Sequence, residues 1–218
     1  MRRRAPVIVG LTGSIGMGKT TAAGMLRRLG VPVHDSDAAV HRLFADGGGA
    51  VEAVEAAFPG AVREGRVDRP ALGALVFDDR DALRRLEAIV HPLVQAESRA
   101  FLRRCAMRGD RVAVLDVPLL LETGGEARCD MVAVVSAPAF IQRQRVLARP
   151  GMTEEKLAAI LERQMPDAEK RRRADFVIPT GLGRAVTLRA LQRLLELARA
   201  APPRHWPPIP PRRRTAHA

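Results

Sequence analysis

The chain has 218 residues, of which 47% are hydrophobic, so it can form one sizeable domain with its own core and is too short for two ordinary domains. It contains no run of eighteen uninterrupted apolar residues, and its basic start leads at once into a glycine-rich stretch. We therefore expect no membrane span, no cleavable leader and a cytoplasmic location. Cys105 and Cys129 have neither a redox nor a metal-binding spacing, so we expect small buried or half-buried thiols in a reducing compartment.

The formal net charge of +12 is concentrated at the chain ends. Arg2, Arg3 and Arg4 at the start, with Arg204, Arg212, Arg213 and Arg214 in the last seventeen residues, supply +7 and leave +5 for residues 5–201. The chain has seven aromatic residues and no tyrosine, so it offers few stacking platforms for bases. We therefore expect no nucleic-acid partner and an anionic small-molecule substrate.

The first predicted elements form the opening of a βαβ unit. Pro6–Gly13 is a β-branched apolar run that predicts a buried parallel strand. Residues 19–30 follow as a helix closed by Gly30, and residues 31–37 begin a second strand. This order predicts an α/β fold with a doubly wound parallel sheet.

The rest of the chain alternates between helical and strand-like patterns. Residues 38–107 are mostly helical, with breaks at 46–49, at 59–60, at Pro70 and at Pro92. Strand-like runs cover 111–122, 130–137 and 174–180, and helices are expected at 138–149, at 153–164 with Thr153 as the cap, and at 184–200. Residues 202–218 are rich in proline and arginine and are expected to be a disordered tail.

The stretch GSIGMGKT, Gly13–Thr20, matches the phosphate-loop pattern G-x-x-x-x-G-K-[ST] in full. In this pattern glycines let backbone amides converge on phosphate, the lysine adds a positive charge, and the final hydroxyl reaches Mg²⁺. A strand precedes the loop and a helix follows it, so the helix start also faces the anion. The nucleotide-contacting residues are predicted to be Gly13, Ser14, Ile15, Gly16, Met17, Gly18, Lys19, Thr20 and Thr21.

A phosphate loop predicts nucleoside-triphosphate binding but does not define the reaction. The N-K-x-D guanine motif of GTPase switches is missing, and the chain has no asparagine at all. Large motor ATPases need a much longer chain. The sequence therefore favours a small-molecule kinase, and an NTP-dependent nucleic-acid-binding protein is the rival from another class.

A second group of candidate residues follows the second predicted strand in VHDSDAAVHRL, Val33–Leu43. His34, Asp35, Asp37 and His41 have the chemistry of a metal site, but the phosphate loop already places Mg²⁺ through Thr20. Asp37 could instead be only a helix cap, or it could be the base that accepts a proton from the attacking hydroxyl. We favour the base and leave the other two interpretations open.

Taken together, LTGSIGMGKTT, VHDSDAAVHRL, LEAIVHPLV, VPLLLE, QRQRVLARPGMTEEKLAAILERQ and ADFVI resemble the dephospho-CoA kinase family over residues 6 to about 198. The resemblance implies ATP-dependent phosphorylation of the ribose 3′-hydroxyl of dephospho-CoA, with ATP and Mg²⁺ bound on a P-loop core. It also implies a helical substrate-binding insertion and a helical lid. Another small-molecule or nucleotide P-loop kinase is the alternative.

The resemblance assigns roles to individual residues. Asp37 matches the catalytic carboxylate of the family's D-A-D element, which is D-S-D here, and Arg145 and Arg149 match lid arginines that lie on one helical face and neutralise the transferred phosphoryl group. His91 contacts substrate or fixes a helix junction, and Asp116 helps to bind Mg²⁺ with Thr20. Thr180 stands where the family often has asparagine, which removes the basis for an adenine contact there.

The expected organisation has four parts. Residues 1–37, 110–140 and 172–201 form the nucleotide-binding core, 38–109 the dephospho-CoA-binding insertion, 141–171 the arginine lid and 202–218 the tail. Glu122 is expected only to cap or to pair with a neighbouring arginine, and Lys170–Asp175 to be a solvated basic face. We expect a monomer or a weak homo-oligomer.

Overall fold

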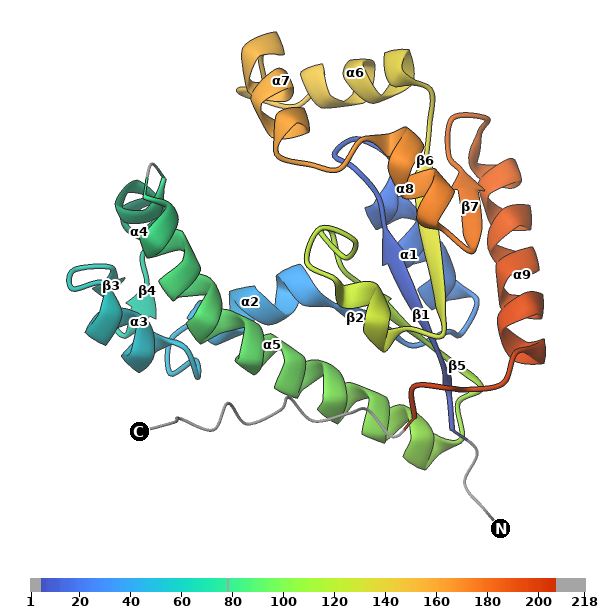
Figure 1. Ribbon diagram of the computed structural model, residues 1–218, viewed down its shortest axis with the longest axis horizontal. Coiled ribbons are helices and arrows are strands. Elements are labelled where there is room, and N and C mark those ends of the chain that lie inside the picture. The colour runs from blue at the N-terminus through green and yellow to red at the C-terminus, as the bar shows by residue number, and fades with distance from the viewer. Residues whose placement is uncertain (1–4, 78, 207–218) are drawn as a thin grey trace. The chain divides into compact units, whose positions relative to one another are not determined.

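The computed structural model describes residues 5–77 and 79–206 (Figure 1). The three arginines expected to charge the start of the chain, and residues 207–218 of the expected tail, lie outside the described residues. The described chain divides into two compact units, one of residues 5–34 with 102–206 and the other of residues 35–77 with 79–101. Each unit is described by itself below.

The first unit is built on a five-stranded sheet with the order β2-β5-β1-β6-β7. The strands are β1 (Val7–Thr12), β2 (Val33–Asp35), β5 (Val112–Asp116), β6 (Met131–Ser136) and β7 (Phe176–Pro179). Strand β1 pairs in parallel with β5 and with β6, which places it at the centre of the sheet. All six residues of β1 are buried, as expected for a strand covered on both faces.

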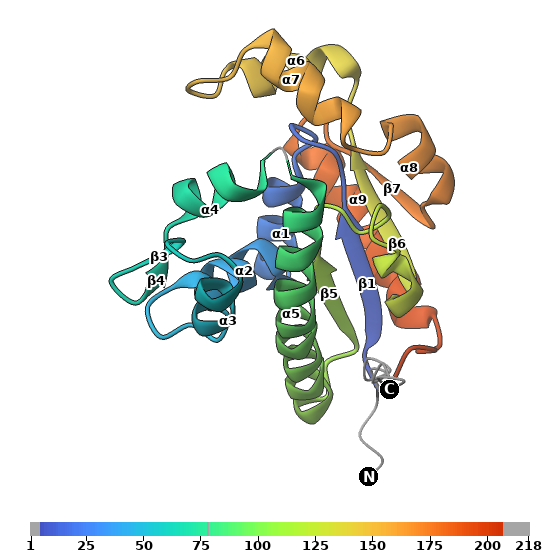
Figure 2. The ribbon, with the colours of Figure 1, turned by 60° about the vertical axis from the view of Figure 1, so that its left-hand side comes forward.

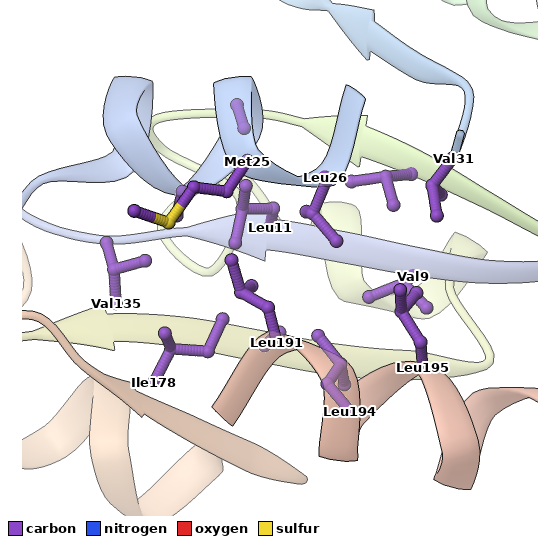
Figure 3. Packing of buried hydrophobic residues seen from close by; sticks show 14 of the residues in the cluster. Val9, Leu11, Met25, Leu26, Val31, Val135, Ile178, Leu191, Leu194 and Leu195 are labelled. Carbon is purple, nitrogen blue, oxygen red and sulfur yellow. The ribbon is translucent and has the colours of Figure 1, made fainter. Parts of the chain in front are cut away.

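Helices α1 (Lys19–Arg28) and α9 (Arg184–Ala200) share one face of this sheet and pack against each other. Figure 3 shows Met25 and Leu26 of α1 and Leu191 of α9 converging on Leu11 of β1. The odd-numbered positions of β1 point into this core because side chains alternate along a strand. Both helices were predicted from the sequence, and each buries its apolar stripe here.

The opposite face is covered by the segment that follows β5 and by α8 (Asp167–Arg173). A Cβ atom at Gly10 of β1 would lie 2.5 Å from Leu120 Cδ2 and 2.8 Å from Cys129 Sγ, so glycine allows this close approach. The remaining elements of the unit are α6 (Ala139–Leu147), α7 (Glu154–Glu162) and a 3-10 turn, η1, at Gly125–Arg128. Both cysteines are buried and unbridged, which confirms the expectation of small buried thiols.

The second unit has its own hydrophobic core. It comprises α2 (Ser36–Phe44), α3 (Val51–Ala57), the hairpin of β3 (Val62–Arg63) and β4 (Arg66–Val67), α4 (Arg69–Val76) and most of α5 (Arg80–Arg108). Figure 2 shows α5 as one continuous helix. The expected helices are confirmed, whereas the hairpin was not anticipated because its strands are only two residues long.

The break expected at Pro92 is wrong, because α5 runs through it. Proline removes one backbone hydrogen bond and normally kinks a helix. Here Ile89, Val90, Leu93 and Val94 pack on the core on either side of the proline, and this packing keeps the two halves in one helix.

Two further expectations in the first unit are wrong. The strand expected over residues 111–122 ends at Asp116, and the chain then turns with Leu120 and Leu121 still buried. A short apolar run is equally compatible with a strand and with a buried turn, which explains the error. Helix α8 was not predicted because its basic sequence has no apolar periodicity. Among the described residues no helix is both long enough and apolar enough to span a bilayer.

Candidate active site

The phosphate-loop pattern lies where β1 ends and α1 begins. Strand β5 lies on one side of β1, and β6, the next strand of the sheet along the chain, lies on the other side. Ligands of open parallel sheets bind beyond the carboxyl ends of the strands at such a point. The first turn of α1 holds no acidic residue, so the positive end of the helix remains available to an anion.

Two glycines of the loop adopt conformations that other residues avoid. Gly16 has φ 76° and Gly18 has φ 87°, both left-handed. A Cβ atom at Gly16 would also lie 2.6 Å from Val146 Cγ2 and 3.0 Å from the Gln142 carbonyl oxygen. Glycine at position 16 is therefore required by backbone conformation and by space.

Lys19 opens α1, and its ammonium group lies 2.6 Å from Oδ1 of Asp116 at the end of β5. The Asp116 side chain is 4% exposed and that of Lys19 is 17% exposed. The parallel pairing of β1 with β5 sets Asp116 beside Leu11, which brings the two charges together. Both residues were candidates from the sequence, Lys19 for nucleotide binding and Asp116 for Mg²⁺ binding, but their direct contact was not predicted.

Three successive carbonyl groups of the loop face side chains of α6 and of the segment that follows β7. Gln142 of α6 donates from Nε2 to Ile15 O at 2.8 Å, and the Thr180 hydroxyl donates to Met17 O at 2.6 Å. The Arg145 guanidinium lies 3.5 Å from Gly16 O. In a planar trans peptide the N–H points away from the C=O, so the amides that follow these carbonyls face the other way. The Met17 N–H donates to Ser14 O at 3.1 Å, so among these amides those of Gly16 and Gly18 are the candidates for binding phosphate.

The backbone amide of Ile15 also has a side-chain partner. Its N–H donates to Oε1 of Gln164, which follows α7, at 3.0 Å. The contacts of Gln142, Gln164 and Thr180 with the loop were not predicted, because these residues lie more than 120 positions away from it in the sequence. One sign of these contacts was visible in the sequence, since position 180 is threonine where the family often has asparagine.

The two candidate lid arginines lie in different settings. Arg145, in the last turn of α6, donates to the Thr180 carbonyl at 2.6 Å and is half-buried. Arg149 is exposed and follows the helix, which ends at Leu147 with Ala148 as its C-cap. The expectation that both occupy one helical face is wrong, because the chain turns before Pro150 and Gly151.

The remaining loop residues differ in how far they are exposed. Gly13, Ser14 and Met17 are buried, and Met17 belongs to the core beneath the loop. Thr20 and Thr21 lie in the first turn of α1 and are exposed. The first unit thus brings together Gly13–Thr21, Asp116 and Arg145, whereas Asp37 and His91 belong to the second unit.

In the second unit, Asp35 and Asp37 have distinct local roles. Asp35 is the N-cap of α2, and its Oδ1 accepts the Ala38 N–H at 2.9 Å. Asp37 lies two positions later, in the first turn of α2, and is exposed. The alternative in which Asp37 is only a cap is therefore wrong, since Asp35 caps the helix.

The histidines do not form a metal site with these aspartates. His34 is buried in β2, and His41 is exposed on α2, where its ring lies 2.9 Å from Arg69 Nη1. Across the described residues no group of three or more His, Cys, Asp and Glu side chains could hold a metal ion. His91 is exposed in the middle of α5, so its suggested role at a helix junction is wrong, because there is no junction there.

Glu122 and Lys170 form an ion pair that contradicts two expectations. Lys170 is fully buried, not part of a solvated basic face, and its Nζ lies 2.8 Å from Glu122 Oε1. The partner of Glu122 is therefore this lysine and not an arginine, and Glu122 also accepts the Met165 N–H at 3.0 Å. Burial by itself would raise the pKa of Glu122, but the ion pair with Lys170 and the hydrogen bond from Met165 N–H outweigh it and lower the pKa below 4.5.

The central parallel strand that leads through GSIGMGKT into a helix defines a P-loop nucleotide-binding protein. The family model CoaE, dephospho-CoA kinase, matches residues 7–182. The chain therefore belongs to the dephospho-CoA kinase family.

Similar proteins agree with this assignment. The dephospho-CoA kinase of Paramagnetospirillum magneticum is 70% identical over 164 residues, which are 75% of this chain and 77% of that protein. That of Rhodospirillum rubrum is 59% identical over 202 residues, or 92% and 95% of the two chains. The crystal structure of TT1252 from Thermus thermophilus is 38% identical, covers 89% of this chain and 98% of that one, and has a TM-score of 0.80. Dephospho-CoA kinase from Campylobacter jejuni, 22% identical with a TM-score of 0.59, supports the fold.

Proposed function

We propose that the protein transfers the γ-phosphoryl group of ATP to the ribose 3′-hydroxyl of dephospho-CoA and so produces coenzyme A in the last step of its synthesis. The observation that carries this proposal is a complete phosphate loop, at the carboxyl end of the central strand, in a member of the dephospho-CoA kinase family. The acceptor is thus a small molecule. We further propose a cytoplasmic monomer or weak homo-oligomer with no nucleic-acid partner.

In this proposal the first unit binds ATP. Loop amides, those of Gly16 and Gly18 among them, hold the phosphates. Lys19, which lies beside Asp116, also contacts the β- and γ-phosphates. The positive end of α1 adds to this attraction. Phosphoryl transfer of this kind depends mainly on positioning and on electrostatic stabilisation, and these groups supply both.

Mg²⁺ is the metal that this chemistry implies, and the side chains present fit it. Thr20 offers an exposed hydroxyl and Asp116 a carboxylate, which are the hard oxygen ligands that Mg²⁺ prefers. When bound, the ion neutralises charge on the β- and γ-phosphate oxygens. Thr20 and Asp116 would hold the ion.

The acceptor side of the proposal rests on the second unit, as the dephospho-CoA-binding insertion. Asp37 is its best candidate for a general base, because Asp35 caps α2 and the Asp37 carboxylate is exposed. Asp37 orients the 3′-hydroxyl and accepts its proton as the phosphoryl group is transferred. His91, exposed on α5, is assigned a contact with the substrate.

Residues 141–171 act as the lid in this proposal. Arg145, which already contacts the loop carbonyl of Gly16, and the exposed Arg149 neutralise the charge that spreads over the transferred phosphoryl group. Lid closure excludes water that would otherwise hydrolyse ATP.

A coupled assay that offers dephospho-CoA, shikimate and nucleoside monophosphates as separate acceptors tests the reaction. We expect ADP release only with dephospho-CoA. Turnover with another acceptor alone would favour a different small-molecule P-loop kinase. Salt-dependent binding of nucleic acid without kinase activity would favour the rival of another class.

The role of Asp37 is tested by Asp37→Asn, with Asp35→Asn as the matched control because asparagine can also cap a helix. We expect kcat for Asp37→Asn to fall about 100-fold or more, with ATP affinity nearly unchanged. Turnover close to that of the parent enzyme in this variant would overturn the assignment.

A further inference from the structure

The phosphate loop needs restraint before any ligand binds. Gly16 and Gly18 give it the left-handed conformation that it requires, but glycine also has the largest conformational freedom of any residue. A loop that must present several amides at once loses affinity if those amides are free to turn, since ordering them on binding costs entropy. The structure should therefore hold the loop from a side that does not face the phosphates.

Gln142 and Thr180 hold the loop from the other side. The Gln142 amide group donates to Ile15 O and the Thr180 hydroxyl donates to Met17 O, at 2.8 and 2.6 Å. Both side chains are more than 90% buried, 7% exposed for Gln142 and 8% for Thr180. Buried bonds of this kind have well-defined geometry, and a buried carbonyl that loses its donor is costly.

The geometry of the peptide group connects these bonds to phosphate binding. In the peptides of Ile15–Gly16 and Met17–Gly18, the carbonyls are fixed by Gln142 and Thr180, so the Gly16 and Gly18 amides are turned to the opposite side. The bond from Ile15 N–H to Gln164 fixes the peptide that precedes them. Neither Gln142 nor Thr180 needs to touch ATP to have this effect.

We propose that Gln142 and Thr180 are positioning residues that fix the carbonyls of Ile15 and Met17 so that the loop amides of Gly16 and Gly18 face the phosphates of ATP. The inference rests on one part of the proposed function, namely that ATP is the ligand of the loop. It also gives Thr180, which departs from the family pattern, a role within the loop in place of an adenine contact.

Thr180→Val keeps the shape of the side chain and removes the hydroxyl, and Thr180→Ser keeps the hydroxyl. Gln142→Met removes the donor, with the exposed Gln144→Met on the same helix as its control. The loss of one such bond corresponds to about a 2- to 10-fold weaker affinity. We therefore expect the Kd of ATP with MgCl₂, measured by calorimetry without acceptor, to rise by about this factor in Thr180→Val and Gln142→Met, and to return close to the parent value in Thr180→Ser.

Amide hydrogen exchange of the ligand-free protein measures the loop directly. We expect faster exchange over residues 13–18 in Thr180→Val and Gln142→Met and unchanged exchange in the sheet core. If Thr180→Val or Gln142→Met fails to fold, the ATP affinity and loop exchange of the other variant test the inference. Unchanged ATP affinity and loop exchange in a folded variant would overturn the inference, as would a loss that Thr180→Ser does not restore. A protein that binds ATP as expected but does not phosphorylate dephospho-CoA would contradict the proposed function alone.

Discussion

Lys19 Nζ lies 2.6 Å from Asp116 Oδ1, so the lysine of the phosphate-loop pattern is held by a carboxylate that is 4% exposed. The contact fixes the position of the lysine side chain at the start of α1. It also neutralises a buried acid that would otherwise be costly to bury. Lys19 thus stabilises the first unit, and under the proposed function the same residue also contributes to the affinity for phosphate.

Lys19→Ala should therefore weaken ATP binding and lower stability together. We expect the Kd of ATP to rise by about 10- to 100-fold, the loss expected for hydrogen bonds to a charged group. Calorimetric titration measures the affinity and urea denaturation the stability. The control is Lys156→Ala, which removes an exposed lysine of α7. An unchanged ATP affinity in Lys19→Ala would contradict the assignment of the loop.

The Asp35 cap predicts a stability change that is separate from catalysis. Asp35→Ala removes the acceptor of the Ala38 N–H and should lower the free energy of unfolding by about 1 kcal/mol, and Asp35→Asn should restore most of it. The exposed Asp37→Asn should change it by less than about 0.5 kcal/mol. Urea denaturation of the three variants measures the difference. A larger loss in Asp37→Asn than in Asp35→Ala would show that the two roles are reversed.

The pair of Glu122 and Lys170 predicts a pH-dependent contribution to stability. Glu122→Gln leaves the ammonium of Lys170 buried without its counter-charge, so we expect a loss of about 3–5 kcal/mol in the free energy of unfolding at pH 7. The double variant Glu122→Gln with Lys170→Met should recover much of this loss, because neither side chain then carries an unpaired charge.

The pH dependence follows from the pKa of Glu122, which is lower in the folded protein than its ordinary value of 4.5. The unfolded chain therefore binds the proton first as the pH falls, and stability is lost below about pH 4.5. We expect the parent protein to lose its stability advantage over Glu122→Gln in that range. A constant difference in unfolding free energy between pH 7 and pH 3 would contradict this.

The sequence predicted the elements that local patterns define. The apolar run of β1, the glycine pattern of Gly13–Thr20 and the Thr153 cap of α7, whose Oγ1 accepts the Lys156 N–H at 3.3 Å, all depend on neighbouring residues. The fold class follows from these patterns in chain order, whereas the family was inferred from the resemblance of six segments between residue 6 and about residue 198 to the dephospho-CoA kinases.

What the sequence did not predict depends on distant contacts. Lys170 stands in a run of basic residues that is typical of an exposed surface, and only the carboxylate of Glu122, 48 positions earlier, makes its burial possible. The bond from Thr180 to Met17 spans 163 positions. Since periodicity and composition describe only a short window, neither contact could be inferred from them.

The two buried cysteines should be unreactive in the folded protein. Burial raises the pKa of Cys129 from 9.0 to about 12 and that of Cys105 to about 11, because a thiolate is poorly solvated in these positions. The thiolate is the reactive form, so both thiols should resist an aromatic disulfide reagent at pH 8 in the native protein and react within minutes in denaturant.

Because the unfolded thiols ionise near pH 9.0 and the folded ones only at higher pH, the folded chain keeps its protons longer. Stability is then fully present below pH 9 and falls as the pH rises above it. The single variants Cys105→Ala and Cys129→Ala show which thiol reacts with the reagent. They also show how much of the loss of stability above pH 9 each thiol causes. Rapid modification of either thiol in the native protein at pH 8 would show that its position is more open than the structure indicates.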